Sequence, residues 1–319
     1  MAKLPVVCIV GPTASGKTAL SLALAKTLGG EIVSADSMQI YQDLNIGTAK
    51  PTLEEQAQAK HHMIDVVSPF EDYSVARYVE EAERCIADIH KRGKLPIVVG
   101  GTGLYVDSLM RGATFAAQVE DPHYRAEMEA LAAREGKETL LALLSEVDPV
   151  QAQKLHVNDV KRVIRALEVY HTTGKRISEH NEATSERPER YRTCWLGLTY
   201  HDRAKLYERI DRRVDLMLAD GLVEELIKIQ RKGIAQNATA MQAIGYKELW
   251  DVPNGEPVEL ASERLKQATR RYAKRQLTWF RRNSKIYWIE ADLAENFDAI
   301  IQESTDFIQS CGIMEVPFC

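Results

Sequence analysis

The sequence predicts an α/β protein with a parallel sheet core and an inserted helical subdomain. Apolar runs of strand length at 6–10 and 95–99 alternate with helical segments early in the chain, a pattern typical of parallel sheets. From 121 to about 191 the chain is helical and charged, and strand character returns at 194–199. We therefore divide the chain into a first core part (1–113), the helical insertion (114–192) and a second core part (193–319).

Composition excludes several classes of protein. Of 319 residues, 45% are hydrophobic and 27% are charged, which leaves no case for disorder. The five cysteines are scattered without a Cys-x-x-Cys pair, which argues against a disulfide framework or a zinc ribbon and suits a reducing compartment. The N-terminus leaves no room for a signal peptide, and no apolar run approaches ~20 residues. We expect a cytoplasmic protein with no membrane partner.

The first strand is followed by a glycine-rich loop and a helix. The loop consists of Gly11, Pro12, Thr13, Ala14, Ser15, Gly16, Lys17 and Thr18. Gly-x-x-x-x-Gly-Lys-Thr in this context is the phosphate-binding loop, whose amides converge on an anion at the helix N-terminus. Lys17 supplies a cation for the phosphates, and the Thr18 hydroxyl is a ligand for Mg²⁺. The prediction is a P-loop NTPase-like (nucleoside-kinase-like) core that binds a di- or triphosphate, ATP included.

Two further strands end in polar residues at the edge where open α/β sheets bind ligands. The strand predicted at 31–37 ends in Asp36 and Ser37. From spacing alone, Asp36 either faces the phosphate site or is a helix cap or a group behind the Mg²⁺ ligands. The strand at 95–99 leads into a second glycine-rich turn with Thr102, whose hydroxyl either reaches a ligand or belongs to a plain tight turn.

A metal site at the paired histidines His61 and His62 is not favoured. They lie in a strand predicted at 61–67, where adjacent side chains point to opposite faces. No other ligand stands at a matching spacing. We interpret both histidines as structural.

The second core part contains most of the basic residues that we expect to bind phosphate groups or RNA. A helix at 206–217 contains Arg213, and arginines from a late helix close over the phosphates in kinase-like folds. A helix at 264–283 and the residues after it hold many cations and no acid. These cations are Arg264, Lys266, Arg270, Arg271, Lys274, Arg275, Arg281, Arg282 and Lys285. Such a face is usually only solvated, but beside aromatic residues it indicates a polyanion such as an RNA backbone.

Three other segments are predicted with less local signal. In the insertion, Lys161, Arg162 and Arg165 lie on a helix at 157–171, and such a cluster is usually a solvated face. The polar stretch 175–192 is predicted to be a loop or a mobile edge, and 244–247 is predicted to lie in a helix.

Taken in order, these motifs resemble the bacterial tRNA dimethylallyltransferase (tRNA isopentenyltransferase) family over nearly the whole chain. The phosphate-binding loop alone fits many families, whereas the ordered series fits few. The matching segments are 11–18, 36–41, 45–51, 61–65, 98–105, 158–162, 244–248 and 274–281. The resemblance implies transfer of a dimethylallyl group from dimethylallyl diphosphate to the N6 amine of the adenosine 3′ to the anticodon. That adenosine is at position 37, in tRNAs that read codons starting with U, and pyrophosphate is released.

The resemblance also implies roles for residues. Asp36 would be the base, with Thr102 beside it, and Arg213, Lys17 and Mg²⁺ on Thr18 would neutralise the pyrophosphate. The implied tRNA contacts are Asp36, Ser37, Met38, Gln39, Thr102, Arg125, Lys161, Arg162, Val163, Ile164, Arg165, Lys274, Arg275 and Arg281. The expected partners are the tRNA anticodon loop and dimethylallyl diphosphate, and the expected state is a monomer.

Three alternatives remain at this point. A P-loop nucleoside or metabolite kinase would use ATP in the loop and Asp36 as the base, but leaves the basic helix unexplained. A prenyltransferase acting on free adenine nucleotides would not need a long cationic surface. An RNA-binding module switched by a nucleotide would bind ATP or GTP without turnover.

Overall fold

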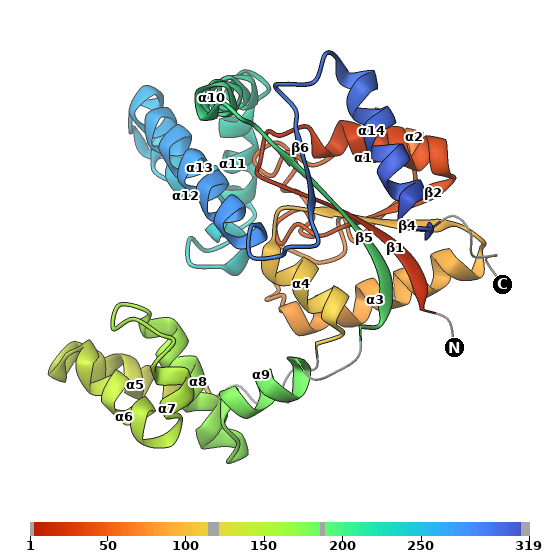
Figure 1. Ribbon diagram of the computed structural model, residues 1–319. Helices are drawn as coiled ribbons and strands as arrows, with labels where there is room; N and C mark the ends of the chain where they lie inside the picture. Colours follow the sequence, from red (N-terminus) through yellow and green to blue (C-terminus); the bar gives the residue numbers. More distant parts are fainter. Residues whose placement is uncertain (1–2, 114–120, 186–188, 314–319) are drawn as a thin grey trace. The chain divides into compact units, whose positions relative to one another are not determined.

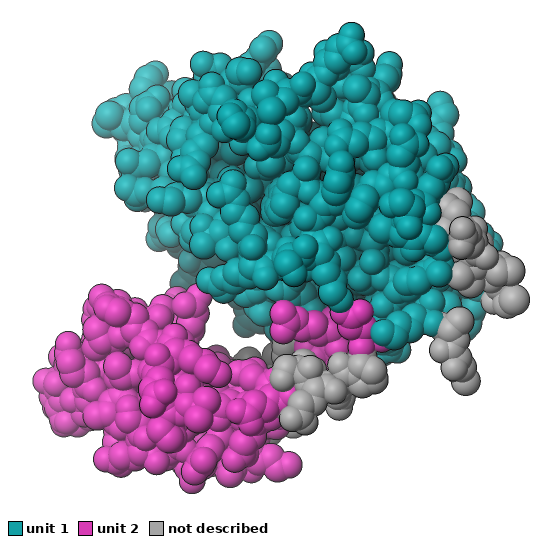
Figure 2. All heavy atoms as spheres, viewed as in Figure 1, with its two compact units in different colours: residues 1–110, 190–319 teal, residues 111–189 magenta. Residues whose placement is uncertain are grey.

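The computed structural model describes residues 3–113, 121–185 and 189–313 (Figure 1). By its internal contacts the chain divides into two compact units, which Figure 2 shows in two colours. One unit comprises residues 1–110 and 190–319, and the other comprises residues 111–189. The sequence analysis placed the insertion at 114–192.

The first unit is built on a six-stranded sheet in the order β3-β2-β4-β1-β5-β6, in which every pair of neighbours is parallel. The central strand β1 has Val7 opposite Ile97 on one side and opposite Cys194 on the other. Because all strands run the same way, their carboxyl ends meet at one edge. The strands are β1 (Leu4–Val10), β2 (Gly30–Ser34), β3 (His61–His62), β4 (Leu95–Gly100), β5 (Tyr191–Thr199) and β6 (Tyr287–Glu290).

Helices cover both faces of this sheet, and alternation along β1 separates the two cores. Val6, Cys8 and Val10 belong to the cluster under α3 (Val75–Lys91) and α4 (Gly103–Arg111). Val7 and Ile9 instead pack with α1 (Lys17–Leu28) and α14 (Phe297–Ser310) on the opposite face. A strand buried on both faces reads as a continuous apolar run, as β1 does.

A second layer of helices lies beyond the carboxyl ends of the strands and contains most of the matching segments 244–248 and 274–281 (Figure 1). Helix α10 packs along α13, and the short α12 contacts both α11 and α13. The remaining elements of this unit are α2 (Leu53–Gln58), α10 (Arg203–Ala219), α11 (Leu222–Arg231), η1 (Thr239–Gln242), α12 (Tyr246–Leu249), η2 (Val252–Asn254) and α13 (Val258–Phe280).

The second unit is helical throughout its described part and has its own core. Met128, Leu140, Leu144, Val163 and Leu167 form a cluster that includes no residue of the sheet. The helices are α5 (Pro122–Glu135), α6 (Lys137–Val147), α7 (Pro149–Ala152), α8 (Val160–Thr173) and α9 (Ile177–Ser185). A separate apolar cluster allows this unit to be stable by itself.

Three predictions of secondary structure were wrong. The predicted loop 175–192 contains α9 and the start of β5, and 186–188 lie outside the described residues. The polar composition of this stretch favoured a loop, but a tertiary contact holds the start of α9. The buried Asp148 carboxylate accepts the Ser178 N–H at 3.0 Å. The strand predicted at 61–67 stops after His62, because Met63 (φ 62°) and Asp65 (φ 55°) are left-handed.

The predicted helix at 244–247 begins only at Tyr246, after Gly245 at φ 113°. The sequence analysis also missed α14.

Among the described residues, no helix is both long and apolar enough to cross a membrane.

Candidate active site

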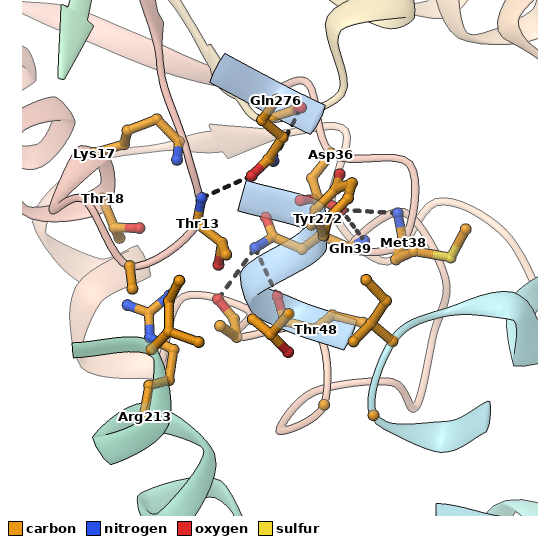
Figure 3. Close-up of a pocket in the computed structure, with 18 of the residues that line it drawn as sticks. Thr13, Lys17, Thr18, Asp36, Met38, Gln39, Thr48, Arg213, Tyr272 and Gln276 are labelled. Atoms are coloured by element: carbon orange, nitrogen blue, oxygen red, sulfur yellow. Dashed lines mark hydrogen bonds between the residues drawn. The ribbon is translucent and has the colours of Figure 1, made fainter. Parts of the chain in front are cut away.

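A cavity of about 480 Å³ opens at the carboxyl edge of the sheet (Figure 3). All of its walls belong to the first unit. They come from the loops after β1, β2 and β4, from the first turn of α1, from Glu55, from the segments 47–49 and 242–245, and from one side each of α10 and α13. The polar and charged lining includes Thr13, Ser15, Lys17, Thr18, Asp36, Ser37, Gln39, Thr48, Glu55, Arg209, Arg213, Thr269, Tyr272, Arg275 and Gln276.

One end of the cavity is the loop between β1 and α1. Gly11 has φ 141°, and a Cβ there would lie 2.3 Å from the Leu198 carbonyl oxygen, so only glycine fits. Gly16, at φ 100°, is the residue before the first turn of α1. The Ser15 hydroxyl is buried and has no hydrogen-bond partner among the described residues. A helix N-terminus with an unsatisfied buried hydroxyl is suited to an anion.

Three cations gather at this end of the cavity. Lys17 Nζ donates to the Pro12 carbonyl at 2.6 Å, and Arg209 Nε donates to the Ala14 carbonyl at 3.0 Å. Burial, and then the charge of Arg213, lower the pKa of Lys17 to about 7, against the opposing effect of Asp36. Burial and Arg209 likewise lower the pKa of Arg213. This crowding of positive charge would be relieved by a bound polyanion.

The other end of the cavity is built around Asp36, two residues after β2. Its Oδ1 accepts the Met38 N–H at 2.9 Å and the Gln39 N–H at 3.4 Å. Burial raises the pKa of Asp36, while those two amides and Lys17 oppose the rise. Of the alternatives left open, a helix cap does not apply, because the residues directly after Asp36 form a turn and not a helix; its carboxylate accepts two amides of that turn and lines the cavity. A carboxylate with a raised pKa in a cavity is suited to accept a proton.

Thr102 lies beside the same turn. Its Oγ1 accepts the Ser37 N–H at 3.0 Å and donates to the Ser37 hydroxyl at 3.3 Å. The two strand ends approach closely, because a Cβ on Gly100 would lie 2.1 Å from the Ala35 carbonyl oxygen. Thr102 is therefore part of the hydrogen-bonded network around residues 36–39.

Sequence reasoning missed the inner face of α13. The Gln276 side chain is 5% exposed, and its Oε1 accepts the Thr13 N–H at 2.8 Å. Its Nε2 donates to the Gly101 carbonyl at 3.0 Å, so one amide joins the two glycine-rich loops. Tyr272, one turn earlier, has its hydroxyl pKa raised by burial and by the charge of Asp36. The spacing of Tyr272 and Gln276, i and i+4, was the available signal.

The basic surface of α13 is smaller than the sequence analysis predicted. Lys266 pairs with Asp215 at 2.7 Å, Arg270 pairs with Asp211 at 2.5 Å, and Arg264 pairs with Glu256. These acids lie outside the segment 264–285, in which the sequence analysis found cations and no acid. Lys274, Arg275 and Arg281 are exposed. The Arg275 guanidinium lies 5.5 Å from the centre of the Tyr272 ring, at the cavity wall.

In the helical unit, the predicted tRNA-contacting residues have different surroundings. Val163 and Ile164 are 1% and 4% exposed, in the core of that unit. Direct contact of their side chains with tRNA is therefore not supported, because the fold buries them. Arg125 and Arg165 both contact the buried Glu168, at 2.7 and 2.6 Å. Arg162 pairs with Asp159 at 3.0 Å, and Lys161 is exposed.

The paired histidines have structural partners. His62 Nε2 lies 2.7 Å from the Glu31 carboxylate, and His61 Nδ1 lies 2.7 Å from the Ala59 carbonyl. In the described part of the chain, no group of three or more His, Cys, Asp or Glu side chains is arranged to hold a metal ion.

Comparison with known proteins gives a consistent result. Residues 39–283 match the family described as IPP transferase, and residues 4–69 match the family described as isopentenyl transferase. A tRNA dimethylallyltransferase from Acetivibrio thermocellus is 48% identical over 309 residues, covering 97% of this chain and 98% of the relative. One from Bacillus velezensis is 49% identical over 289 residues, covering 90% and 91%.

Two solved structures are similar along most of the chain. The tRNA isopentenylpyrophosphate transferase from Bacillus halodurans has a TM-score of 0.72 and 43% identity, covering 98% of this chain and 97% of that one. A eukaryotic dimethylallyltransferase acting on tRNA has a TM-score of 0.79 and 33% identity, covering 96% and 80%.

Proposed function

The chain belongs to the IPP transferase family, and from that premise we propose that it transfers a dimethylallyl group from dimethylallyl diphosphate to tRNA. The proposed acceptor is the N6 amine of the adenosine at position 37, 3′ to the anticodon, in tRNAs that read codons starting with U. One observation carries the proposal. A single cavity has a cationic phosphate loop at one end, the carboxylate of Asp36 at the other, and apolar wall residues such as Met217 and Leu265.

Departure of pyrophosphate is the first requirement. The allylic C–O bond breaks, its electron pair leaves with the diphosphate, and the carbon fragment carries the developing positive charge. Such a cation is fairly stable, so neutralising the leaving group is the main task of the protein. Lys17, Arg213 and the loop amides are placed to do this, and the Ser15 hydroxyl is available to donate to a phosphate oxygen.

Mg²⁺ is part of the proposal. Thr18, at the start of α1, offers an oxygen ligand at the cavity wall. Mg²⁺ prefers oxygen ligands and is commonly held by a few protein groups together with substrate phosphates. When bound, the ion would add positive charge at the leaving group.

The acceptor amine needs a base. Its lone pair is delocalised into the adenine ring, so removal of its proton as the C–N bond forms is useful. Asp36 is the candidate, because burial raises its pKa and two backbone amides fix its orientation. Ser37, Met38 and Gln39 would line the acceptor pocket. The adenosine would leave the anticodon-loop stack, at a cost of about a few kcal/mol.

The RNA backbone requires cations outside the cavity. Lys274 and Arg281 are exposed on or just after α13, and Arg275 is exposed at the cavity wall. Phosphate contacts of this kind supply affinity without sequence selection. The phosphate loop and Asp36 of the same chain line one cavity, and we propose that the protein acts as a monomer.

The test is direct transfer. Purified protein is incubated with Mg²⁺, labelled dimethylallyl diphosphate and unmodified tRNA, in parallel with Asp36→Ala protein and with labelled ATP replacing the prenyl donor. Label is expected in the adenosine 3′ to the anticodon, and not with Asp36→Ala. Absence of transfer together with movement of phosphate from ATP to a small molecule would overturn the proposal in favour of a kinase.

A further inference from the structure

Part of the cavity wall is a segment without regular secondary structure. Residues 37–50 form no helix and only one isolated bridge, from Tyr41 to Val67. Even so, residues 47–49 line the cavity. Loops open locally at lower free-energy cost than packed elements, so a wall of this kind requires an anchor if it is to hold a substrate in place.

Glu225, on α11, provides such an anchor. One carboxylate accepts three consecutive backbone N–H groups and one phenolic hydroxyl. These are the N–H of Asn45 at 3.1 Å, of Ile46 at 3.0 Å and of Gly47 at 3.2 Å, and the hydroxyl of Tyr246 at 2.6 Å. Two carboxylate oxygens have enough lone pairs for four donors, and their charge strengthens each bond.

The anchored loop in turn holds Gln39 (Figure 3). Gln39 Nε2 donates to the carbonyls of Thr48 and Ala49, at 3.2 and 3.1 Å. Its Oε1 accepts the Ser34 hydroxyl at 3.1 Å, and its backbone N–H donates to Asp36 Oδ1 at 3.4 Å. A continuous set of hydrogen bonds thus runs from Glu225, through the loop and Gln39, to Asp36.

Two further features hold this loop. The buried Lys50 side chain donates to the Tyr41 carbonyl at 2.8 Å and to Asn45 Oδ1 at 2.9 Å, and the loop packs closely against Tyr246. A Cβ on Gly47 would lie 2.6 Å from the ring of Tyr246, which is fully buried. Gly245, at φ 113°, lies against the backbone of Gly47. The loop therefore packs against the buried Tyr246 ring, whose hydroxyl binds the same carboxylate as the loop amides.

From these contacts we propose that Glu225 is a positioning residue for the acceptor adenosine. The inference rests on the proposed function. Glu225 does not line the cavity, so it acts through the loop, which sets Gln39 beside the base. Loss of its charge would leave backbone N–H groups facing an amide, weaken the hold on Gln39 and impair tRNA binding. The diphosphate end of the cavity would be unaffected.

The first experiment compares Glu225→Gln with Glu224→Gln, since Glu224 is the exposed neighbour on the same helix. For Glu225→Gln we expect the KM for tRNA to rise about tenfold, with the KM for dimethylallyl diphosphate within about twofold of wild type. Glu224→Gln is expected to match wild type. A merely structural role would lower the amount of active protein and move neither KM, and that result would overturn the inference.

Amide hydrogen exchange follows the anchor without using the reaction. We expect exchange at 45–47 to become more than about tenfold faster in Glu225→Gln and to stay unchanged in Glu224→Gln. Unchanged exchange at 45–47 in Glu225→Gln would overturn the inference. Failure of the proposed function is distinguishable, because it would be seen as absent transfer in the wild-type protein.

A double-mutant cycle with Gln39→Ala tests the connection itself. If Glu225 acts through Gln39, the increase in KM for tRNA in the double variant should be close to that of the larger single change. Multiplicative effects would show that the two residues act independently, and would contradict the proposed route.

Discussion

The two ends of the cavity are built in different ways. The phosphate end starts from eight consecutive residues, 11–18, much of it backbone at the start of a helix, and Arg209 and Arg213 of α10 are added to it. The acceptor end combines the turn at 36–39, the loop at 45–49, Thr102 and the inner face of α13. The loop of the first end is local in sequence, whereas the second end exists only in the folded chain.

Their polar groups also differ in how far they are satisfied. At the phosphate end, Ser15 Oγ is unpaired among the described residues and the pKa of Lys17 is lowered to about 7. At the acceptor end, Asp36 accepts two amides, and Gln39 is held by two carbonyls. The comparison indicates that one end is prepared to gain contacts from a ligand, and that the other is prepared to keep its shape.

The largest expected effect is on transfer and not on pyrophosphate binding. Asp36→Asn should lower the single-turnover transfer rate by about 10³-fold, because general-base catalysis contributes about 10²–10⁴. Pyrophosphate affinity, measured by calorimetry, should stay within about threefold of wild type. A variant that loses pyrophosphate binding to the same degree as transfer would contradict the division into two ends.

The same base predicts a pH dependence. Only ionised Asp36 accepts a proton, and its pKa is raised by burial. The wild-type transfer rate should therefore fall as the pH is lowered through that raised pKa. The residual rate of Asp36→Asn should lack this acidic limb, as seen in single-turnover rates across pH.

The next effect belongs to the phosphate end. Lys17→Met should weaken pyrophosphate binding by about 100-fold, the loss expected for strong charge-assisted contacts. With a pKa of about 7 in the free protein, Lys17 is mostly neutral at pH 8, and a bound polyanion favours its charged form. Wild-type binding at pH 8 should therefore take up close to one proton, and affinity should fall as pH rises above about 7.

Calorimetry in buffers of different ionisation enthalpy measures that proton uptake. Pyrophosphate itself titrates, so the Lys17→Met protein serves as the reference. Equal uptake by the two proteins would show that Lys17 does not change protonation on binding.

A smaller effect should appear at both ends together. Gln276→Leu leaves the Thr13 N–H and the Gly101 carbonyl without their partner, in a buried position. We expect pyrophosphate affinity and the transfer rate each to fall about tenfold. Gln267→Leu, at an exposed position of the same helix, should leave both unchanged. An effect confined to one end would show that Gln276 does not join them.

The smallest effect lies outside the cavity. Lys274→Ala should weaken tRNA binding about threefold and reduce the salt slope of log K by about one. Lys266→Ala, on the same helix but paired with Asp215, should change both less. Filter binding of tRNA between 50 and 200 mM salt (roughly the range where phosphate contacts are resolved) makes the comparison. If the two variants lost equal tRNA affinity, Lys266 would contact RNA in spite of its ion pair with Asp215.

The sequence predicts the parts of the site that are local in the chain, and it misses the contacts between distant segments. The phosphate loop is recognisable because its spacing and flanking elements are local, and Asp36 and Thr102 were found because they follow predicted strands. Gln276 was missed because its partner Thr13 is 263 residues away, and Glu225 because its loop is 178–180 residues away. The paired cations of α13 were overcounted for the same reason, since Asp211 and Asp215 lie on α10.

The sheet order has a consequence for how the chain is made. Strand β1 lies between β4 and β5, and β5 ends at Thr199, roughly a hundred residues after β4 ends at Gly100. At about 5–20 residues per second, a nascent chain waits about 5 to 20 seconds with one edge of β1 unpaired. Such an edge exposes unpaired backbone N–H and C=O groups on a strand with apolar side chains, and it is open to wrong pairing. Because Gly11 packs against Leu198 on β5, the phosphate loop is among the first parts synthesised and among the last to be completed.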